Sequence, residues 1–189
     1  INGAVRSSGD TLNFGTTTVA GNSSVDTTNA GASPLGGNVF FCATTATPTT
    51  ATRTIDAGTV GNVFLTGQVT VQSFTVSNSS SISAQAISTS TGASGPISLT
   101  AQNSISLLGA VDAGSSTVSV SANQDGVGAE PLGMLSSSSI ATTNTGANAI
   151  VIRVNTAAGG TGSAILASLQ TGATGTIQVD VTAPAAGGV

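Results

Sequence analysis

The chain of 189 residues contains no lysine, histidine, tryptophan or tyrosine, and charged residues make up only 5% of it. In a typical soluble domain about a quarter of the residues are charged. Because the chain has only three arginines and a net charge of −4, it cannot form a basic patch for a phosphate backbone. We therefore expect no nucleic-acid partner.

The absence of histidine and lysine also removes the bases that usually activate a nucleophile. No Ser–His, Cys–His or Ser–Lys pair can form. A carbohydrate-active β-helix enzyme would need clustered acids and aromatic residues that stack on sugars. This chain has only seven acids, and its five phenylalanines are its only aromatic residues. We expect neither enzymatic activity nor a cofactor.

A single cysteine provides no internal disulfide, and no apolar run approaches the length of a membrane-spanning helix. Ser, Thr, Ala and Gly make up more than half of the chain, yet hydrophobic residues still account for 39%. This hydrophobic fraction favours a folded chain over a disordered one. The sequence opens without an initiator methionine, which suggests a processed chain or a piece of a longer one.

β-Branched and small residues dominate, while long helix-forming residues are nearly absent, so we predict an all-β fold. One pattern recurs: an apolar residue, a few polar residues, a glycine and then an alternating strand. The glycines that mark it are Gly31, Gly58, Gly92, Gly114, Gly146 and Gly172. The repeats are clearest from residue 25, and we expect one domain over residues 1–183 followed by a linker-like tail over 184–189.

Each expected strand alternates apolar and polar residues, which is typical of a sheet with one buried face. Val118 and Val120 are expected to point inward, as are Ile177, Val179 and Val181 in the last strand. Because tandem units stack most simply in parallel, the sequence predicts a right-handed parallel β-solenoid (β-helix) of irregular coils. Roughly seven or eight coils would stack about 4.8 Å apart. An antiparallel β-sandwich stays open as the alternative.

Segments 97–105, 120–130 and 142–146 share one style of short strand repeat that is rich in small polar residues. They resemble units of the giant β-strand-repeat surface proteins of planctomycetes and other Gram-negative bacteria, which are akin to filamentous-haemagglutinin-type adhesins. The resemblance covers about residues 25–183. It implies a right-handed parallel β-helix, secretion to the bacterial cell surface, and a role in adhesion or filament formation.

Four acids are candidate calcium ligands. Asp56 and Asp112 occupy matching places in their repeats, as Asp26 does, so the three carboxylates could form a column on one face that binds calcium. The loop that contains Asp125 and Glu130 is the second candidate. We favour the interpretation that these acids hold turns and bind no metal, because an aspartate before a turn can accept hydrogen bonds from nearby backbone amides.

Phe40 and Phe64 occupy the same place in two strands in which Phe41 and Leu65 take the other face. If Phe41 and Leu65 are core residues, Phe40 and Phe64 point outward and stack on neighbouring coils, with Cys42 on the same face. An exposed aromatic pair on a polar rod suggests contact with another subunit. We expect this face to make an assembly contact, and the uncapped ends to pair with neighbours or to continue into a longer chain.

These observations predict an extracellular structural or adhesive β-repeat protein, part of a filament, a surface layer or a giant adhesin. A glycan- or ice-binding module is the alternative, because flat ranks of outward threonines can order water. The threonines that suggest it, such as Thr89 and Thr142, do not recur at one fixed place in every coil. Expected partners are further copies of the chain and surface glycans.

Overall fold

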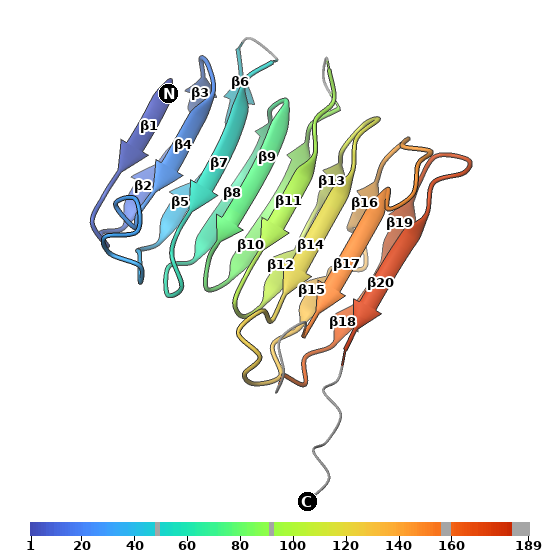
Figure 1. Ribbon diagram of the computed structural model, residues 1–189. Coiled ribbons are helices and arrows are strands. Elements are labelled where there is room, and N and C mark those ends of the chain that lie inside the picture. The colour runs from blue at the N-terminus through green and yellow to red at the C-terminus, as the bar shows by residue number, and fades with distance from the viewer. Residues whose placement is uncertain (48–49, 91–92, 156–159, 183–189) are drawn as a thin grey trace, which may run out of the picture.

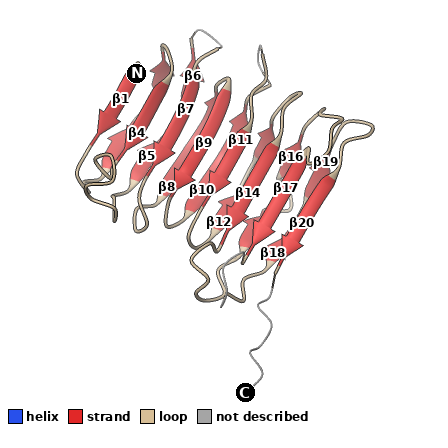
Figure 2. Ribbon diagram, viewed as in Figure 1, coloured by secondary structure: helices blue, strands red, loops and turns tan. Residues whose placement is uncertain are grey.

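The computed structural model describes residues 1–47, 50–90, 93–155 and 160–182, and every regular element within them is a β-strand. The strands advance from β1 at one end to β20 at the other as a single stack with two facing walls (Figure 1). Figure 2 shows the same view with strands and connecting loops distinguished. The predicted all-β class is confirmed. The described residues contain no helix that could span a membrane.

One wall is an eight-stranded sheet whose strands follow one another in chain order along the stack. Each coil contributes one strand to it. These strands are β1 (Gly3–Arg6), β4 (Ser23–Asp26), β7 (Thr52–Asp56), β9 (Ser73–Asn78), β11 (Ile97–Thr100), β14 (Val118–Ala122), β17 (Ile150–Val154) and β20 (Ile177–Val181).

The other wall is a twelve-stranded sheet. Most coils contribute two short strands to it, whereas β8 and β10 each span both positions. Its strands are β2 (Leu12–Phe14), β3 (Thr17–Val19), β5 (Val39–Phe41), β6 (Thr44–Ala46), β8 (Val63–Thr70), β10 (Ile82–Ser88), β12 (Ile105–Leu107), β13 (Ala110–Asp112), β15 (Leu132–Met134), β16 (Ser139–Ala141), β18 (Ala164–Ile165) and β19 (Ser168–Gln170).

Every ladder between these strands is parallel, and each strand pairs with strands of adjacent coils. Antiparallel pairing among the described residues is limited to one isolated bridge, Ser8–Thr28. The parallel β-solenoid is therefore confirmed, and the alternative of an antiparallel β-sandwich is wrong. The eight strands of the first sheet agree with the predicted number of coils.

Columns of apolar side chains fill the interior and run along the stack. In the first sheet, one such column has members that are each at most 1% exposed: Val25, Ile55, Val76, Leu99, Val120 and Ile152. Full burial of a side chain of this size contributes roughly 1.5–3 kcal/mol relative to exposure. Contact between successive members of a column therefore holds each coil to the next.

Left-handed backbone conformations turn the chain from one sheet to the other. Gly58 has a φ of 74°, and a Cβ at this position would lie 2.5 Å from the carbonyl oxygen of Leu35, so the corner requires glycine. Asn123 and Asn155 follow β14 and β17 at equivalent corners, with φ values of 52° and 62°. Nδ2 of Asn123 donates to Oδ1 of Asn155 at 2.6 Å, so the two buried amides link successive coils.

The repeat pattern read from the sequence shifts by half a coil along the chain. The first two marker glycines precede β5 and β8 of the second sheet, whereas the later ones precede β11, β14, β17 and β20 of the first sheet. Positions that match in the sequence repeat therefore do not all lie in the same sheet. Both kinds of corner use the same small turn residues, so the local pattern does not distinguish them. Gly92 and residues 184–189 lie outside the described residues.

Strand β20 keeps its predicted orientation but not its predicted burial. Ile177 pairs with Ile150 and Val179 with Ile152, so both stay in the inward columns. Ile177, Val179 and Val181 are nevertheless 42%, 43% and 42% exposed, because β20 has a neighbour on one side only among the described strands.

Candidate functional site

The predicted aromatic face is formed by strands β5 and β8. The rings of Phe40 and Phe64 stack with centroids 4.6 Å apart and planes 11° from parallel. Both rings are half-buried, whereas Val39 and Phe41 on the opposite side of β5 are buried. Cys42 follows β5 and carries an exposed free thiol. The two phenylalanines therefore stack as predicted, and contact of this face with another subunit stays a prediction.

The predicted column of three aspartates does not form. Asp56 is in register with Asp26 in the first sheet, whereas Asp112 lies in β13 of the second sheet. The hypothesis of a shared column is wrong because the two repeats are offset by half a coil. Asp56 and Asp112 therefore do not share one column of carboxylates.

Three of the four calcium candidates hold turns. In Asp56, Asp112 and Asp125, Oδ1 accepts a hydrogen bond from the backbone N–H two residues further along, at 3.0, 2.9 and 2.9 Å. Glu130 is half-buried, and its Oε2 has no hydrogen-bond partner. Within the described residues, no group of three or more Cys, Asp or Glu side chains is arranged to hold a metal ion.

Asp26 anchors the corner that follows β4. Its Oδ1 accepts from the amide and the hydroxyl of Thr28 at 2.8 and 2.7 Å, and its Oδ2 accepts from the amide of Ala30 at 2.8 Å. Nε of Arg6 lies 3.5 Å from Oδ2. Partial burial alone would raise the pKa of this carboxyl, but the hydrogen bonds, with Arg6, lower the pKa below its ordinary value. The carboxylate thereby stabilises the left-handed turn that includes Ala30.

Strand β7 places Arg53 in the interior, which sequence reasoning missed. The side chain is 1% exposed, and its guanidinium carbon lies 4.5 Å from the ring centroid of Phe41. None of its three guanidinium nitrogens has a hydrogen-bond partner. Burial lowers the pKa of Arg53 to about 10. The signal was present, because Arg53 stands two residues before Ile55 in an alternating strand and shares its inward face.

An outward column of small hydroxyl side chains crosses five successive coils of the first sheet. It is set by the strand register, and its members are Ser24, Thr54, Thr75, Ser98 and Ser119. Side chains in a parallel sheet repeat about every 4.8 Å across the strands, so these hydroxyls form a regular rank. Sequence reasoning missed it because the column mixes serine with threonine.

Two of the threonines that first suggested ice binding lie outside this rank. Thr89 and Thr142 are buried at corners. Their Oγ1 atoms donate to the backbone carbonyls of Gly95 at 2.6 Å and Gly114 at 2.9 Å. These two threonines therefore close turns and present no hydroxyl to an external ligand.

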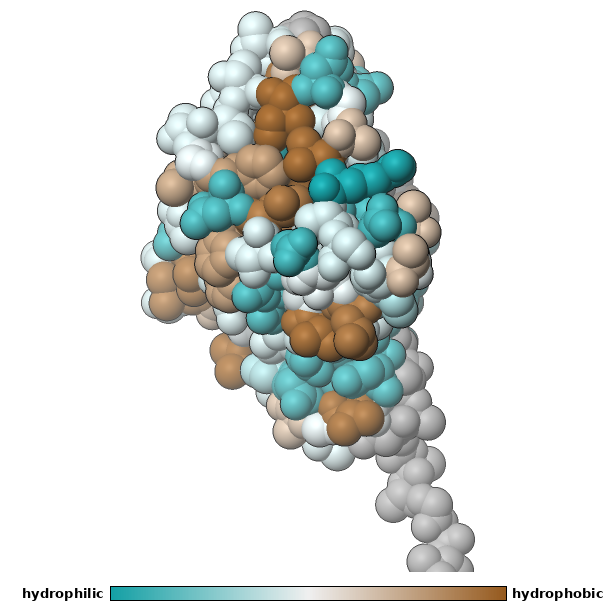
Figure 3. Space-filling model, turned by 90° about the vertical axis from the view of Figure 1, so that its left-hand side faces the viewer, coloured by the Kyte–Doolittle hydropathy of each residue, from teal (hydrophilic) through white to brown (hydrophobic). Residues whose placement is uncertain are grey.

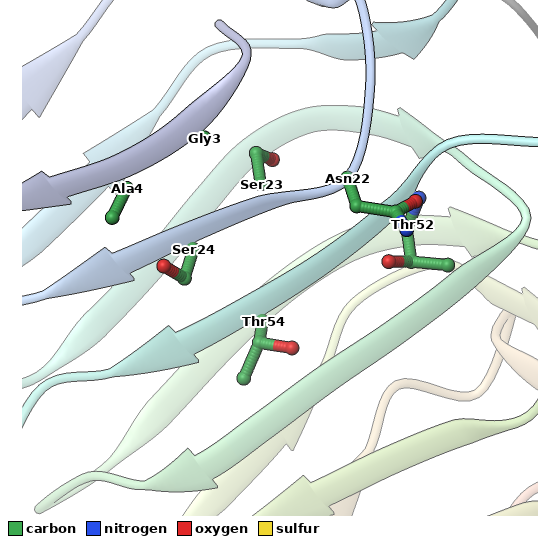
Figure 4. Close-up of a pocket in the computed structure, with 7 residues that line it drawn as sticks. All are labelled: Gly3, Ala4, Asn22, Ser23, Ser24, Thr52 and Thr54. Carbon is green, nitrogen blue, oxygen red and sulfur yellow. The ribbon is translucent and has the colours of Figure 1, made fainter.

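A shallow depression of about 320 Å³ lies where the hydroxyl rank begins (Figure 4). In Figure 4, Ala4, Ser24 and Thr54 come from three neighbouring strands, and Asn22 and Thr52 lie side by side at one rim. The depression is lined by Gly3, Ala4, Asn22, Ser23, Ser24, Thr52 and Thr54. It offers hydroxyls and one amide, but no charged side chain, to a ligand.

No protein-family model, curated protein or solved structure matches this chain. The function is therefore argued from the aromatic face, the hydroxyl rank and the two ends of the stack.

Proposed function

We propose that the chain is a structural or adhesive β-repeat protein of the extracellular space or bacterial cell surface, and that it belongs to a filament, a surface layer or a giant adhesin. The observation that carries the proposal is the continuous stack of parallel coils with apolar columns along its whole length. The location outside the cell rests on the resemblance of the repeats to those of bacterial surface proteins.

A stack of this kind suits a mechanical role. Bending it would separate apolar side chains in successive coils and break parallel ladders, so it resists deformation along its axis. The missing histidine and lysine leave no conventional nucleophile–base pair for hydrolytic catalysis. Both features favour a scaffold over an enzyme.

The stacked pair Phe40 and Phe64, with Cys42 beside it, is the proposed lateral contact between copies. Half-buried aromatic rings among polar residues gain free energy when a partner covers them. The double substitution Phe40→Ser/Phe64→Ser should weaken self-association in sedimentation velocity. Ser83→Ala with Ser106→Ala is the matched control, because both serines lie in the same outward column. Unchanged association of the phenylalanine variant would remove this contact from the proposal.

A second candidate function, binding of a glycan or of ice, is favoured by the outward hydroxyl rank of the first sheet. Evenly spaced hydroxyls can hydrogen-bond to a regular surface or to a sugar chain. Thr75→Arg, at the centre of the rank, should abolish inhibition of ice recrystallisation or retention on an insoluble polysaccharide. If the unmodified chain shows neither effect, this candidate is excluded.

A further inference from the structure

Within the residues that the structure describes, the strands at both ends of the solenoid are paired on one side only. At one end, β1, β2 and β3 pair with β4, β5 and β6; at the other, β18, β19 and β20 pair with β15, β16 and β17. Such edges expose unpaired backbone amides and carbonyls and are templates for further strands. Each end therefore presents three parallel strand edges.

The side chains at these ends are those of an uncovered core. Ile150 and Ile152 are fully buried in β17, while Ile177 and Val179, one coil further on, are 42% and 43% exposed. At the opposite end, shown face-on in Figure 3, hydrophobic side chains lie among hydrophilic ones. These include Leu12 and Phe14, which pack against the core but stay partly exposed.

The two ends match when the columns are continued from one copy to the next. In the first sheet, the column that ends at Val179 begins at Val5, and the column that ends at Ile177 begins at Gly3. In the second sheet, the column that ends at Ala164 begins at Leu12. In these three columns apolar side chains would meet apolar ones, or the open space above Gly3, across the junction. The inward column of the second sheet that ends at Leu169 begins at Thr17, so there an apolar side chain would meet a threonine.

The outward charges match as well. One outward column of the first sheet starts with Arg6 and Asp26 and finishes with Arg153 and Asp180. Continued into a second copy, the column reads Arg153, Asp180, Arg6, Asp26, Asp56, so the junction sets Asp180 opposite Arg6 and places Arg6 between two carboxylates. Opposite charges in facing positions favour one register over its alternatives.

We propose that copies of this chain join head to tail, with β20 of one copy pairing in parallel with β1 of the next and Asp180 opposite Arg6. The inference rests on the proposed structural function and names its partner as a second copy. The interface is heterologous and leaves each copy with one free end, so repeated addition makes an open filament. The matched columns favour a second copy of this chain over an unrelated strand as the partner at each end.

Charge reversal tests the register. Asp180→Arg sets arginine against Arg6, and Arg6→Asp sets aspartate against Asp180, so each variant alone should associate about tenfold more weakly than the unmodified chain. In a 1:1 mixture, every junction between unlike copies is complementary, and association should return. Asp125→Arg, in an exposed loop, is the control of equal charge change and should associate normally.

Sedimentation velocity with interference optics is the assay, because the chain lacks tryptophan and tyrosine and absorbs little at 280 nm. Circular dichroism verifies that each variant is folded. A monomeric unmodified chain, or a mixture that associates no better than its components, would overturn the head-to-tail interface. If Phe40→Ser/Phe64→Ser still reduces association while charge reversal does not, the interface is lateral and the proposed structural function stands.

Discussion

Replacing Arg53 with methionine should stabilise the protein. The guanidinium is 1% exposed and has no hydrogen-bond partner, so the folded state carries the full cost of an unpaired buried charge. Burial lowers the pKa of this guanidinium from its ordinary value to about 10, a shift that corresponds to a cost of roughly 3 kcal/mol, since one pKa unit is about 1.4 kcal/mol. Stacking on Phe41 offsets about 0.5–2 kcal/mol of that cost.

Methionine keeps an unbranched stem of similar length and removes the charge. We therefore expect Arg53→Met to raise the free energy of unfolding by about 1–3 kcal/mol at pH 7. Arg53→Ala is the matched variant, because it removes the charge but leaves a cavity beside Phe41 and should gain less or lose stability. Urea unfolding followed by far-ultraviolet circular dichroism measures both.

The pH dependence isolates the same charge. Below pH 10 Arg53 is protonated in the folded and unfolded chains, and the burial penalty is complete. As pH rises through about 10, the folded chain loses this proton first, so stability increases until the arginine of the unfolded chain also titrates at its higher, ordinary pKa. The expected gain between pH 9 and 11 is about 1.4 kcal/mol. The chain has no lysine or tyrosine to titrate in this range.

Arg53→Met should abolish this rise. A methionine variant that is less stable than the unmodified chain by 1 kcal/mol or more would refute the reasoning, as would an equal rise with pH in both proteins. Either result would mean that the guanidinium is satisfied in the folded state.

Three further predictions concern the corners and the ends. Asn155→Ala should leave the side chain of Asn123 and the amide and carbonyl of Gly162 without their partner, and destabilise the protein by about 1–3 kcal/mol for each buried group left unpaired. Urea unfolding measures this loss, and an unchanged midpoint of the urea transition would contradict the asparagine link. Because the pKa of Asp26 is lowered in the folded chain, the stabilisation by its carboxylate is complete above about pH 4 and is lost as pH falls further. Asp26→Asn should therefore cost about 1–2 kcal/mol of unfolding free energy at pH 7 and reduce the loss of stability below pH 4; an equal loss of stability in both proteins would contradict this role of Asp26. In a Cys42→Ser background, the pair Ala4→Cys and Gln178→Cys should form disulfide-linked chains under oxidation, because head-to-tail pairing sets these positions opposite each other; Ser24→Cys with Gln178→Cys, one coil out of register, should not.

The fold class and the strand faces could be predicted because alternation is a local property. Val118 and Val120 lie inside as expected, since one apolar residue in two is enough to define a buried face. Phe40 and Phe64 could be paired for the same reason, because their strands share both sequence style and sheet.

The assignment of strands to sheets could not be predicted. It depends on the length of each corner. The corners after Asp56 and Asp112 use the same small residues, although one leads from the first sheet to the second and the other from the second sheet to the first. The burial of Arg53 was overlooked because a lone charge is rarely placed in a core. The exposure of Val179 depends on what stacks on β20, which no local pattern specifies.

Electron microscopy of the purified chain tests the claim of a self-assembling structural solenoid most directly. The head-to-tail register adds one coil spacing at each junction, so eight coils at about 4.8 Å give an axial repeat of about 38 Å per copy. We expect unbranched filaments with this repeat. Discrete single particles at all concentrations, or filaments with a repeat that differs by a coil spacing or more, would contradict the account.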